Sequence, residues 1–426
     1  MERKRVVITG MGVVAPNGVG IDDFSHAIHE GRSGIRFQQE SADLNFRCQI
    51  AGIPPITDEY TKKYLPNIYQ RIIKNNAILY GCLAGLEAWE MAGFIPSKER
   101  LPRCGMIFGG GALGLDGFIQ EPIEKIDAGS SRLIGTTIIP QSMNSGAASY
   151  LNQLLGFGGP VISNSSACST GSEAIMMGYE QIQLGKADIM LCGSTEGVGR
   201  YIWGAFDTMR ILASNSNENP EEASKPMSQL ASGFVPSGGA GAIVLETLES
   251  AQKRDATIVA ELVGVAQNCG AQRDGGSMTA PNPKAAIECI KEAIASSGIV
   301  PDEIDLISGH LTSTRADPLE ISNWVTALGL PQEKMPPINT LKSMVGHCIS
   351  AAGSIESVAC LLQIRDNFIH KNINIDPETI HHKIKEIFPI EKIPTETINR
   401  KIKTVIKSNF GFGDVNCSLI FKQFSE

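Results

Sequence analysis

The chain has 426 residues, of which 42% are hydrophobic, and a formal net charge of −8 at pH 7. A chain of this length can bury a large core, and it suggests two domains or two fused halves. The acidic balance argues against a nucleic-acid partner. The apolar stretches are strand-sized and interrupted by glycine or charge, so we predict no membrane span.

Strand-like and helix-like segments alternate along the chain, which indicates an α/β protein. The N-terminal residues predict a first strand at 6–14 rather than a secretory signal, because their apolar run is too short. In chain order, we then predict a helix at 75–92, strands at 103–111 and 187–193, a polar loop at 214–225, strands at 241–245 and 257–266, and a helix at 283–297.

The chain contains ten cysteines, and none of them forms a Cys-x-x-Cys pair. Most lie in apolar segments, which is typical of reduced thiols in a cytoplasmic protein and not of a disulfide framework or a zinc site. The seven histidines show no metal-binding spacing either. We therefore expect a cytoplasmic protein with no bound metal and no cofactor.

Cys168 follows an extended-looking run at 160–167 and precedes a helix-like stretch at 171–182. At such a strand-to-helix turn, the unpaired N–H groups and the helix dipole favour the thiolate, which is the nucleophilic form. The alternative is a buried structural cysteine. The small neighbours of Cys168 would let a substrate approach closely.

A short internal similarity between two segments of the sequence indicates a duplicated unit. Residues 160–164 lead through a turn to the helix after Cys168, and residues 337–340 lead through a turn to a small-residue helix after His347. We predict an N-terminal half at 1–255 with the nucleophile and a C-terminal half at 256–426 with the remaining catalytic groups.

Three later segments carry further candidate residues. A predicted strand ends at His310, a predicted helix start brings Lys342 and His347 together, and a glycine-interrupted turn carries Phe412. Taken singly, a histidine at a strand end is usually a satisfied polar residue, and a Gly-Phe-Gly turn is usually a hairpin. Their occurrence together with Cys168, in this order, favours a catalytic constellation.

These segments resemble the thiolase-superfamily condensing enzymes, and in particular the β-ketoacyl-acyl carrier protein synthases of type II systems. The resemblance covers nearly the whole chain. It rests on residues 5–12, the Ala-Cys-Ser-Thr-Gly turn at 167–171, residues 233–235 and 239–241, the His310 segment, the Lys-Ser-Met-Val-Gly-His stretch at 342–347, and residues 409–413.

The resemblance implies a five-layered αβαβα fold built from two similar halves, and an acyltransferase reaction. Cys168 would accept an acyl group as a thioester. Malonyl on an acyl carrier protein would lose carbon dioxide, and the enolate would attack the acyl-Cys168 to give a β-ketoacyl product. Neutral His310 and His347 would stabilise the enolate, Lys342 would act by its charge and by ordering His347, and the N–H groups of Cys168 and Phe412 would form the oxyanion hole.

The resemblance also implies a substrate pocket. Thr312 and Thr314 would shape the malonyl side, and Phe412 would be a gate, since the glycines beside it give the backbone freedom. Leu311 replaces the glycine that usually follows the first catalytic histidine, and we expect its side chain to narrow the malonyl side of the pocket. Ala112 replaces a bulkier residue of the acyl tunnel, which would leave room for a longer or stiffer chain.

Three more positions depart from the family pattern or match it loosely. Gly239 stands where an acid is common, Asp414 replaces a glycine after the gate and would stiffen that turn, and Glu320 is the candidate for a structural acid. Together with Leu311 and Ala112, these departures favour a specialised type II pathway to a polyketide, polyene or aryl-polyene pigment over housekeeping fatty-acid synthesis.

The expected partners are an acyl carrier protein and a second copy of the chain. Carrier proteins are acidic, so an acidic enzyme needs a local basic patch, for which the candidates are Arg71, Lys74, Arg132 and Arg210. Ordinary surface charge is the alternative for these four.

Two other functions remain as alternatives. One is a heterodimer with a chain-length partner. Non-catalytic chain-length subunits typically lack the active cysteine, which argues against that role for this chain because it keeps Cys168. The remaining form of this alternative is a catalytic subunit that works only as a heterodimer with such a partner. The other is a coenzyme A thiolase, which needs a second late cysteine in a Cys-x-Gly setting. Here the late turn reads Phe410-Gly-Phe-Gly and Cys417 falls in a predicted strand.

Overall fold

The computed structural model describes residues 3–113, 115–116 and 122–425. Within them, eleven strands form one large sheet in the order β11-β10-β14-β15-β9-β1-β8-β7-β5-β6, with β2 paired to β1. The strands are β1 (Val6–Ala15), β2 (Gly18–Val19), β5 (Cys104–Gly110), β6 (Val161–Ile162), β7 (Ile189–Glu196), β8 (Gly239–Thr247), β9 (Ala260–Cys269), β10 (Leu306–Ser308), β11 (Ile338–Asn339), β14 (Thr404–Gly411) and β15 (Val415–Lys422).

The strand order repeats. The first set runs β1-β8-β7-β5-β6 and the second runs β9-β15-β14-β10-β11, so each set places its first, fifth, fourth, second and third strand side by side. The parallel and antiparallel pairings also correspond between the two sets. The sets meet at a short antiparallel contact of β1 with β9. The division at 255/256 falls between α12 (Leu248–Lys253) and β9, and that boundary stays a prediction.

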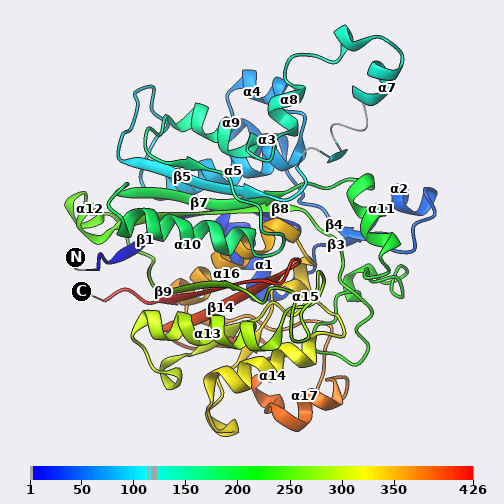
Figure 1. Cartoon of the computed structure of the whole chain (residues 1–426), viewed down its shortest axis with the longest axis vertical. Helices are drawn as coiled ribbons and strands as arrows, with labels where there is room; N and C mark the ends of the chain where they lie inside the picture. Colours follow the sequence, from blue (N-terminus) through cyan, green and yellow to red (C-terminus); the bar gives the residue numbers. More distant parts are fainter. Residues whose placement is uncertain (1–2, 114, 117–121, 426) are drawn as a thin grey trace.

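Helices separate and cover the two sets of strands, as Figure 1 shows. Helix α5 (Asn76–Met91) packs on β1, β7 and β8 from outside, and α13 (Pro283–Ser297) packs on β9 and β15 from the opposite side, where α14 (Asp317–Leu328) lies against α13. Between the sets lie α10 (Thr170–Gln183) and α16 (Ala352–Asp366), which contact strands of both. The expected five-layered αβαβα fold is confirmed.

The two middle helices touch nearly backbone to backbone. A Cβ on Gly171 of α10 would lie 2.3 Å from the Ser354 nitrogen, and a Cβ on Gly353 of α16 would lie 2.4 Å from the Ser172 nitrogen. Residues 352–364 of α16 are all buried, as expected of a helix enclosed on every side. This approach places the segments before the two helices, with Cys168 and His347, next to each other.

Most of the elements predicted from the sequence are confirmed, with ends shifted by a few residues. The extended run at 160–167 is wrong beyond Ile162, because residues 163–168 form an irregular turn. The Thr170 hydroxyl accepts the Ser166 N–H at 2.8 Å and Ala167 adopts a positive φ of 48°, so the chain cannot continue as a strand. The loop at 214–225 contains one short 3₁₀ turn, Pro220–Glu222.

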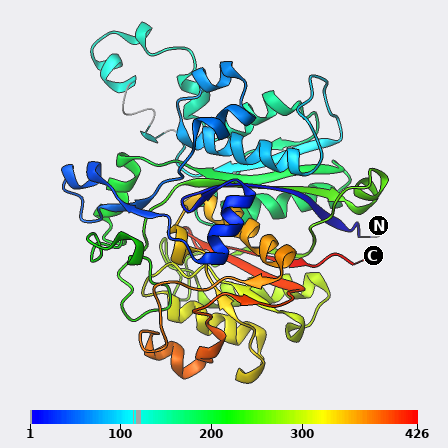
Figure 2. The same cartoon turned by 180° about the vertical axis from the view of Figure 1, so that it is seen from behind.

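The termini lie side by side at one end of the sheet (Figures 1 and 2), where the Arg5 guanidinium donates to the Ser425 carbonyl at 2.8 Å. At the other end of the molecule, α7 (Pro122–Asp127) and the residues after it form an arm that projects from the body. None of the helices in the described residues has the length and apolar character that crossing a membrane requires.

Candidate active site

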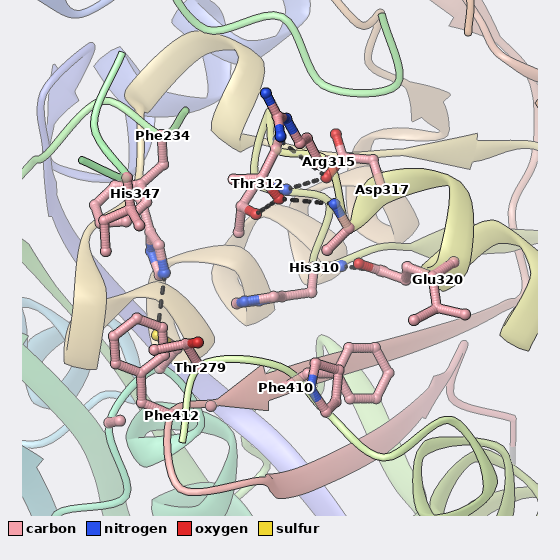
Figure 3. A pocket seen from close by; sticks show the side chains of 18 of the residues that line it. Phe234, Thr279, His310, Thr312, Arg315, Asp317, Glu320, His347, Phe410 and Phe412 are labelled. Atoms are coloured by element: carbon pink, nitrogen blue, oxygen red, sulfur yellow. Dashed lines mark hydrogen bonds between the residues drawn. The ribbon is translucent and has the colours of Figure 1, made fainter. Parts of the chain in front are cut away.

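A cavity of about 300 Å³ lies beside the ends of the middle helices and brings the predicted residues together (Figure 3). Cys168, His310 and His347 line it, as do Thr312, Thr314 and Phe412. Cavities of this size bind small organic groups, and three further aromatic side chains, Phe206, Phe234 and Phe410, form part of the remaining wall. These residues come from four separate loops at the ends of strands and helices, with His310, Thr312 and Thr314 on one of them, so the site exists only in the folded chain.

Cys168 is buried, two residues before α10, and its Sγ lies 3.1 Å from the Nε2 of His347. Burial raises the pKa of the Cys168 thiol to about 11, although the Lys342 charge and the Phe412 N–H both act to lower it. The expectation of a thiolate stabilised by the helix start is therefore wrong for the free enzyme. Loss of solvent around the sulfur outweighs the nearby positive charge and dipoles.

The hydrogen bonds of the two histidines fix their tautomers. The Ile349 N–H donates to His347 Nδ1 at 3.1 Å, so the proton of that ring is on Nε2, facing the sulfur. His310 Nδ1 lies 3.3 Å from Lys342 Nζ and 3.2 Å from Asn409 Nδ2, which are both donors, so this ring too carries its proton on Nε2.

Both imidazoles are neutral. Burial and then the Lys342 charge lower the pKa of His347 to about 3, and the same two causes lower the pKa of His310 well below its usual value. The rings meet edge to face with centroids 5.4 Å apart. Each therefore presents a neutral N–H from its Nε2, which agrees with the state expected from the sequence.

A buried cluster of charge lies behind the histidines. The Glu356 carboxylate forms ion pairs with Lys342 and with Lys407, and Asn409 donates to it at 3.0 Å. All four side chains are almost completely buried. Although burial acts to raise it, the two lysines hold the pKa of Glu356 at about 2. Two lysines and one carboxylate leave one net positive charge beside the cavity.

The role expected for Lys342 needs a correction. Its ammonium group contacts His310 and Glu356, whereas His347 is oriented by the Ile349 N–H and by the sulfur. Lys342 therefore orders His310 and not His347. The reason lies in the tertiary structure, since β10 brings His310 next to the start of α15 (Lys342–Val345).

Sequence reasoning missed Glu356, Lys407 and Asn409. A usable signal was present in the sequence. Lys407 follows Val405 and Ile406 as the one charged residue of its strand, and Glu356 lies in a helix segment of small and apolar residues. A charged residue in such a segment is buried only when it is paired, so each of them indicated an internal partner.

Two acids at the start of α14 hold the loop that carries His310. Glu320 accepts the N–H groups of His310 and Leu311, both at 2.7 Å. Asp317 accepts the N–H of Thr312 at 3.0 Å and that of Ser313 at 3.1 Å. Glu320 therefore contacts the backbone as a structural acid would, while Asp317 was not singled out in advance. The Thr312 and Thr314 hydroxyls lie 3.0 Å apart on the cavity wall.

Two expected pocket residues lie elsewhere. Leu311 is fully buried in the core with Ile307 and Ile321, so it does not narrow the cavity. His310 lines the cavity, whereas Leu311 is not among the residues that line it. Ala112 lines a separate cavity of about 90 Å³ beside Lys74 and does not border the Cys168 cavity.

The backbone geometry at position 239 explains why a glycine stands there. Gly239 adopts a φ of 150°, and a Cβ there would lie 2.5 Å from the Val14 carbonyl oxygen on the neighbouring strand. An acid in this position is therefore excluded by the close approach of β1 and β8.

The four docking candidates are all exposed, but only one of them adjoins the cavity in sequence. Arg210 precedes Ile211, which lines the cavity. Arg71 lies on α4 (Asn67–Ile72), Lys74 borders the Ala112 cavity, and Arg132 lies on the projecting arm. Among the described residues, none of the four forms an ion pair with an acid.

The ligand atoms of Cys168, His310 and His347 lie within 4.8 Å of one another, which is close enough to hold a metal ion. A metal would need the lone pair of each Nε2. Because donors occupy both Nδ1 atoms, the Nε2 atoms carry protons and the residues do not fit a metal in this arrangement.

Comparisons with known proteins agree with this site. The model of the beta-ketoacyl synthase N-terminal domain matches residues 3–251, and that of the C-terminal domain matches residues 259–376. The 3-oxoacyl-[acyl-carrier-protein] synthase 2 of Coxiella burnetii is 33% identical over 427 residues, which cover 99% of each chain.

Two solved structures share the whole fold. One is a type II polyketide synthase acyl-carrier protein in complex with its ketosynthase bound to the hexaketide, with a TM-score of 0.87 at 29% identity over 99% of this chain and 100% of that chain. The other is the ishigamide ketosynthase/chain length factor, with a TM-score of 0.87 at 25% identity over 100% of both chains.

The chain belongs to the beta-ketoacyl synthase family. It is an acyl-transferring condensing enzyme with the thiolase-like fold. The coenzyme A thiolase alternative is not supported, because the late Cys417 is fully buried within β15.

The raised thiol pKa gives a first prediction. Iodoacetamide alkylates thiolates, so we expect the rate constant at Cys168 to rise about tenfold per pH unit between pH ~8 and pH ~10. Peptide mass analysis in a Cys269→Ser background measures it, since this change removes the exposed cysteine that would consume reagent. A plateau below pH ~9 would contradict a neutral buried thiol.

The buried charge cluster gives a second prediction. Glu356→Gln leaves two buried lysines without a counter-charge and is expected to lower the free energy of unfolding by about 3–5 kcal/mol. Urea denaturation measures the change. The double variant Glu356→Gln/Lys407→Met removes one of the two unpaired lysine charges. Its loss of unfolding free energy is therefore expected to be smaller than the sum of the losses in the two single variants. Additive losses would show that the cluster is not coupled.

Proposed function

We propose that this chain carries out the decarboxylative Claisen condensation of an acyl group on Cys168 with malonyl on an acyl carrier protein. The observation that supports this most directly is the facing pair of Cys168 Sγ and His347 Nε2–H at 3.1 Å, with His310 across the same cavity. The product would be a β-ketoacyl thioester, two carbons longer, on the carrier.

In the first half-reaction, the Cys168 sulfur attacks the thioester carbonyl of the acyl donor and the carrier thiol leaves. Because the thiol is neutral before attack, its proton must leave as the new C–S bond forms, passing to the departing thiol. The backbone N–H groups of Cys168 and Phe412 would receive the negative oxygen. The Phe412 N–H already faces the sulfur, which supports this placement.

In the second half-reaction, malonyl loses carbon dioxide and its electron pair becomes an enolate. The Nε2–H groups of His310 and His347 would donate to the enolate oxygen while its carbon attacks the acyl-Cys168 carbonyl. The C–S bond then breaks, the sulfur leaves as a thiolate, and a proton taken up from solvent restores the neutral Cys168 thiol. The net positive charge of the Lys342, Glu356 and Lys407 cluster adds a fixed field of the correct sign in a site with little water.

Cys168→Ala tests the assignment. Intact-mass analysis with a panel of acyl carrier protein thioesters is expected to show one acyl group on the wild-type chain and none on Cys168→Ala, with elongation reduced at least about 10³-fold. Cys269→Ala is the matched control, because that cysteine is exposed and outside the cavity. Elongation by Cys168→Ala at the control rate would refute the proposal.

The range of acyl chains that we propose is broader than the one expected from the residues that depart from the family pattern. Leu311 lies in the core and Ala112 borders another cavity, so neither supports an enlarged acyl tunnel. The relatives named above are a 3-oxoacyl-[acyl-carrier-protein] synthase and a polyketide ketosynthase. The proposal therefore covers carrier-bound fatty-acyl and polyketide chains.

We also propose that the carrier protein docks beside Arg210, at the mouth of the cavity. Arg210→Glu is expected to raise the KM for the acyl carrier protein about tenfold and to leave kcat nearly unchanged, because a charge at the rim steers encounter. Lys186→Glu is the control, since Lys186 is exposed beyond the far end of α10. A similar KM for the two variants would remove Arg210 from the docking surface.

A second copy of the chain is the proposed dimer partner. Large apolar side chains on the arm and the segment after it are exposed, namely Ile123, Ile126, Leu133, Ile139 and Met143. In the part of the chain that the structure describes, β6 is the last strand at the nearby edge of the sheet. Exposed apolar surface and an open sheet edge are features of an interface. Light scattering of the isolated chain measures its molar mass, and we expect the mass of a dimer. The mass of a monomer would instead favour a different partner such as a chain-length subunit.

A further inference from the structure

The turn that carries Phe412 contains an unusual residue. Residues 412–414 connect β14 to β15, and Asp414 adopts a φ of 65°, a region that favours glycine. A side chain in this conformation is strained, yet the Asp414 side chain is fully buried. Such a position is expected to keep an aspartate only where its carboxylate has specific partners.

The partners come from the segment 270–282, which follows β9. Asp414 Oδ1 accepts the N–H of Asn282 at 2.7 Å, and Oδ2 accepts the N–H of Gln272 at 2.9 Å. The backbones are also joined, since Gly270 N–H donates to the Asp414 carbonyl at 3.0 Å and Gly413 N–H donates to the Met278 carbonyl at 2.8 Å. Four hydrogen bonds therefore connect the Phe412 turn to this segment.

The segment 270–282 is shaped around the carboxylate. A Cβ on Gly270 or on Gly276 would lie 2.3 Å from Asp414 Oδ2, so both positions leave space that the carboxylate fills. Ala271, Gln272 and Asp274 all adopt positive φ values, between 49° and 55°. Backbone in this conformation persists only where surrounding contacts hold it.

Both connected parts form walls of the Cys168 cavity. Phe412 lines it from the turn, and Thr279 and Pro281 line it from the segment. Figure 3 shows Thr279 and Phe412 next to each other. Thr279 is exposed at the cavity mouth, whereas Phe412 is half-buried. A movement of either wall would change access to Cys168.

We propose that Asp414 is a positioning residue that clamps the Phe412 turn to the segment 270–282, so that these two walls of the cavity open and close as one unit. When the two walls move together, both N–H bonds to the carboxylate are kept, and movement of one wall without the other requires that both bonds break. The glycines at 411 and 413 would otherwise leave the turn free to move without the segment. The inference rests on the proposed function only in taking this cavity as the path of the acyl group.

The test uses two variants and one matched control in the full chain. Asp414→Gly removes the carboxylate and suits the φ of 65° without strain, and Asp414→Asn keeps the shape but replaces one acceptor oxygen with a donor. Asp274→Gly is the control, because Asp274 also has a positive φ in the same segment but its carboxylate is exposed and pairs with Lys284 at 3.4 Å.

Hydrogen exchange followed by mass spectrometry gives the first readout. In Asp414→Gly, peptides that cover 270–282 and 405–415 are expected to exchange at least about tenfold faster together, while peptides of β7 and α13 keep their wild-type rates. The exchange rates in Asp414→Asn are expected to lie between those of the wild type and Asp414→Gly. In Asp274→Gly, the exchange rate of the peptide that covers 405–415 is expected to equal that of the wild type. Faster exchange of one peptide without the other, or of neither, would overturn the clamp.

Access to Cys168 gives the second readout. The ratio of alkylation by a bulky maleimide to alkylation by a small one is expected to rise about fivefold or more in Asp414→Gly and to stay at the wild-type value in Asp274→Gly. An unchanged ratio in Asp414→Gly would overturn the proposal. Neither readout uses an acyl carrier protein, so failure of the condensation assay with wild-type chain would affect the proposed function and not the clamp.

Discussion

The close contact of α10 with α16 is the constraint on which the site depends. Because Gly171 and Gly353 have no side chains, the two helices of the middle layer approach until the backbone of each touches the other. The residues just before these helices are then neighbours, and they include Cys168 and His347. A nucleophile and an N–H donor that are 179 positions apart in the chain thus lie 3.1 Å apart.

Burial has opposite consequences for the groups that this contact brings together. It keeps both imidazoles neutral and so makes them N–H donors, which is the state that suits an enolate. It also raises the pKa of the Cys168 thiol, which makes the free sulfur a weaker nucleophile than a turn at a helix start suggests. The net positive charge of Lys342, Glu356 and Lys407 partly offsets this, since it favours every anion that forms in the cavity.

The walls of the cavity are held in a different manner from its floor. The floor is made of residues in or next to the buried middle layer and is fixed by packing. The Phe412 turn and the segment 270–282 lie near the mouth and are joined by four hydrogen bonds, two of which are accepted by the Asp414 carboxylate. Hydrogen bonds of this kind open more readily than a packed core, so movement is expected at the mouth while the reacting groups stay in place.

The sequence by itself determined the fold class, the family and the identity of the residues around Cys168, because short motifs with specific residue types carry that information locally. The tertiary structure alone decided which partner each side chain meets. Lys342 contacts His310 rather than His347, Leu311 turns into the core, Ala112 borders a second cavity, and the helix start does not produce a thiolate. Contacts, burial and electrostatic fields depend on atoms from distant parts of the chain, and no local pattern of residues contains them.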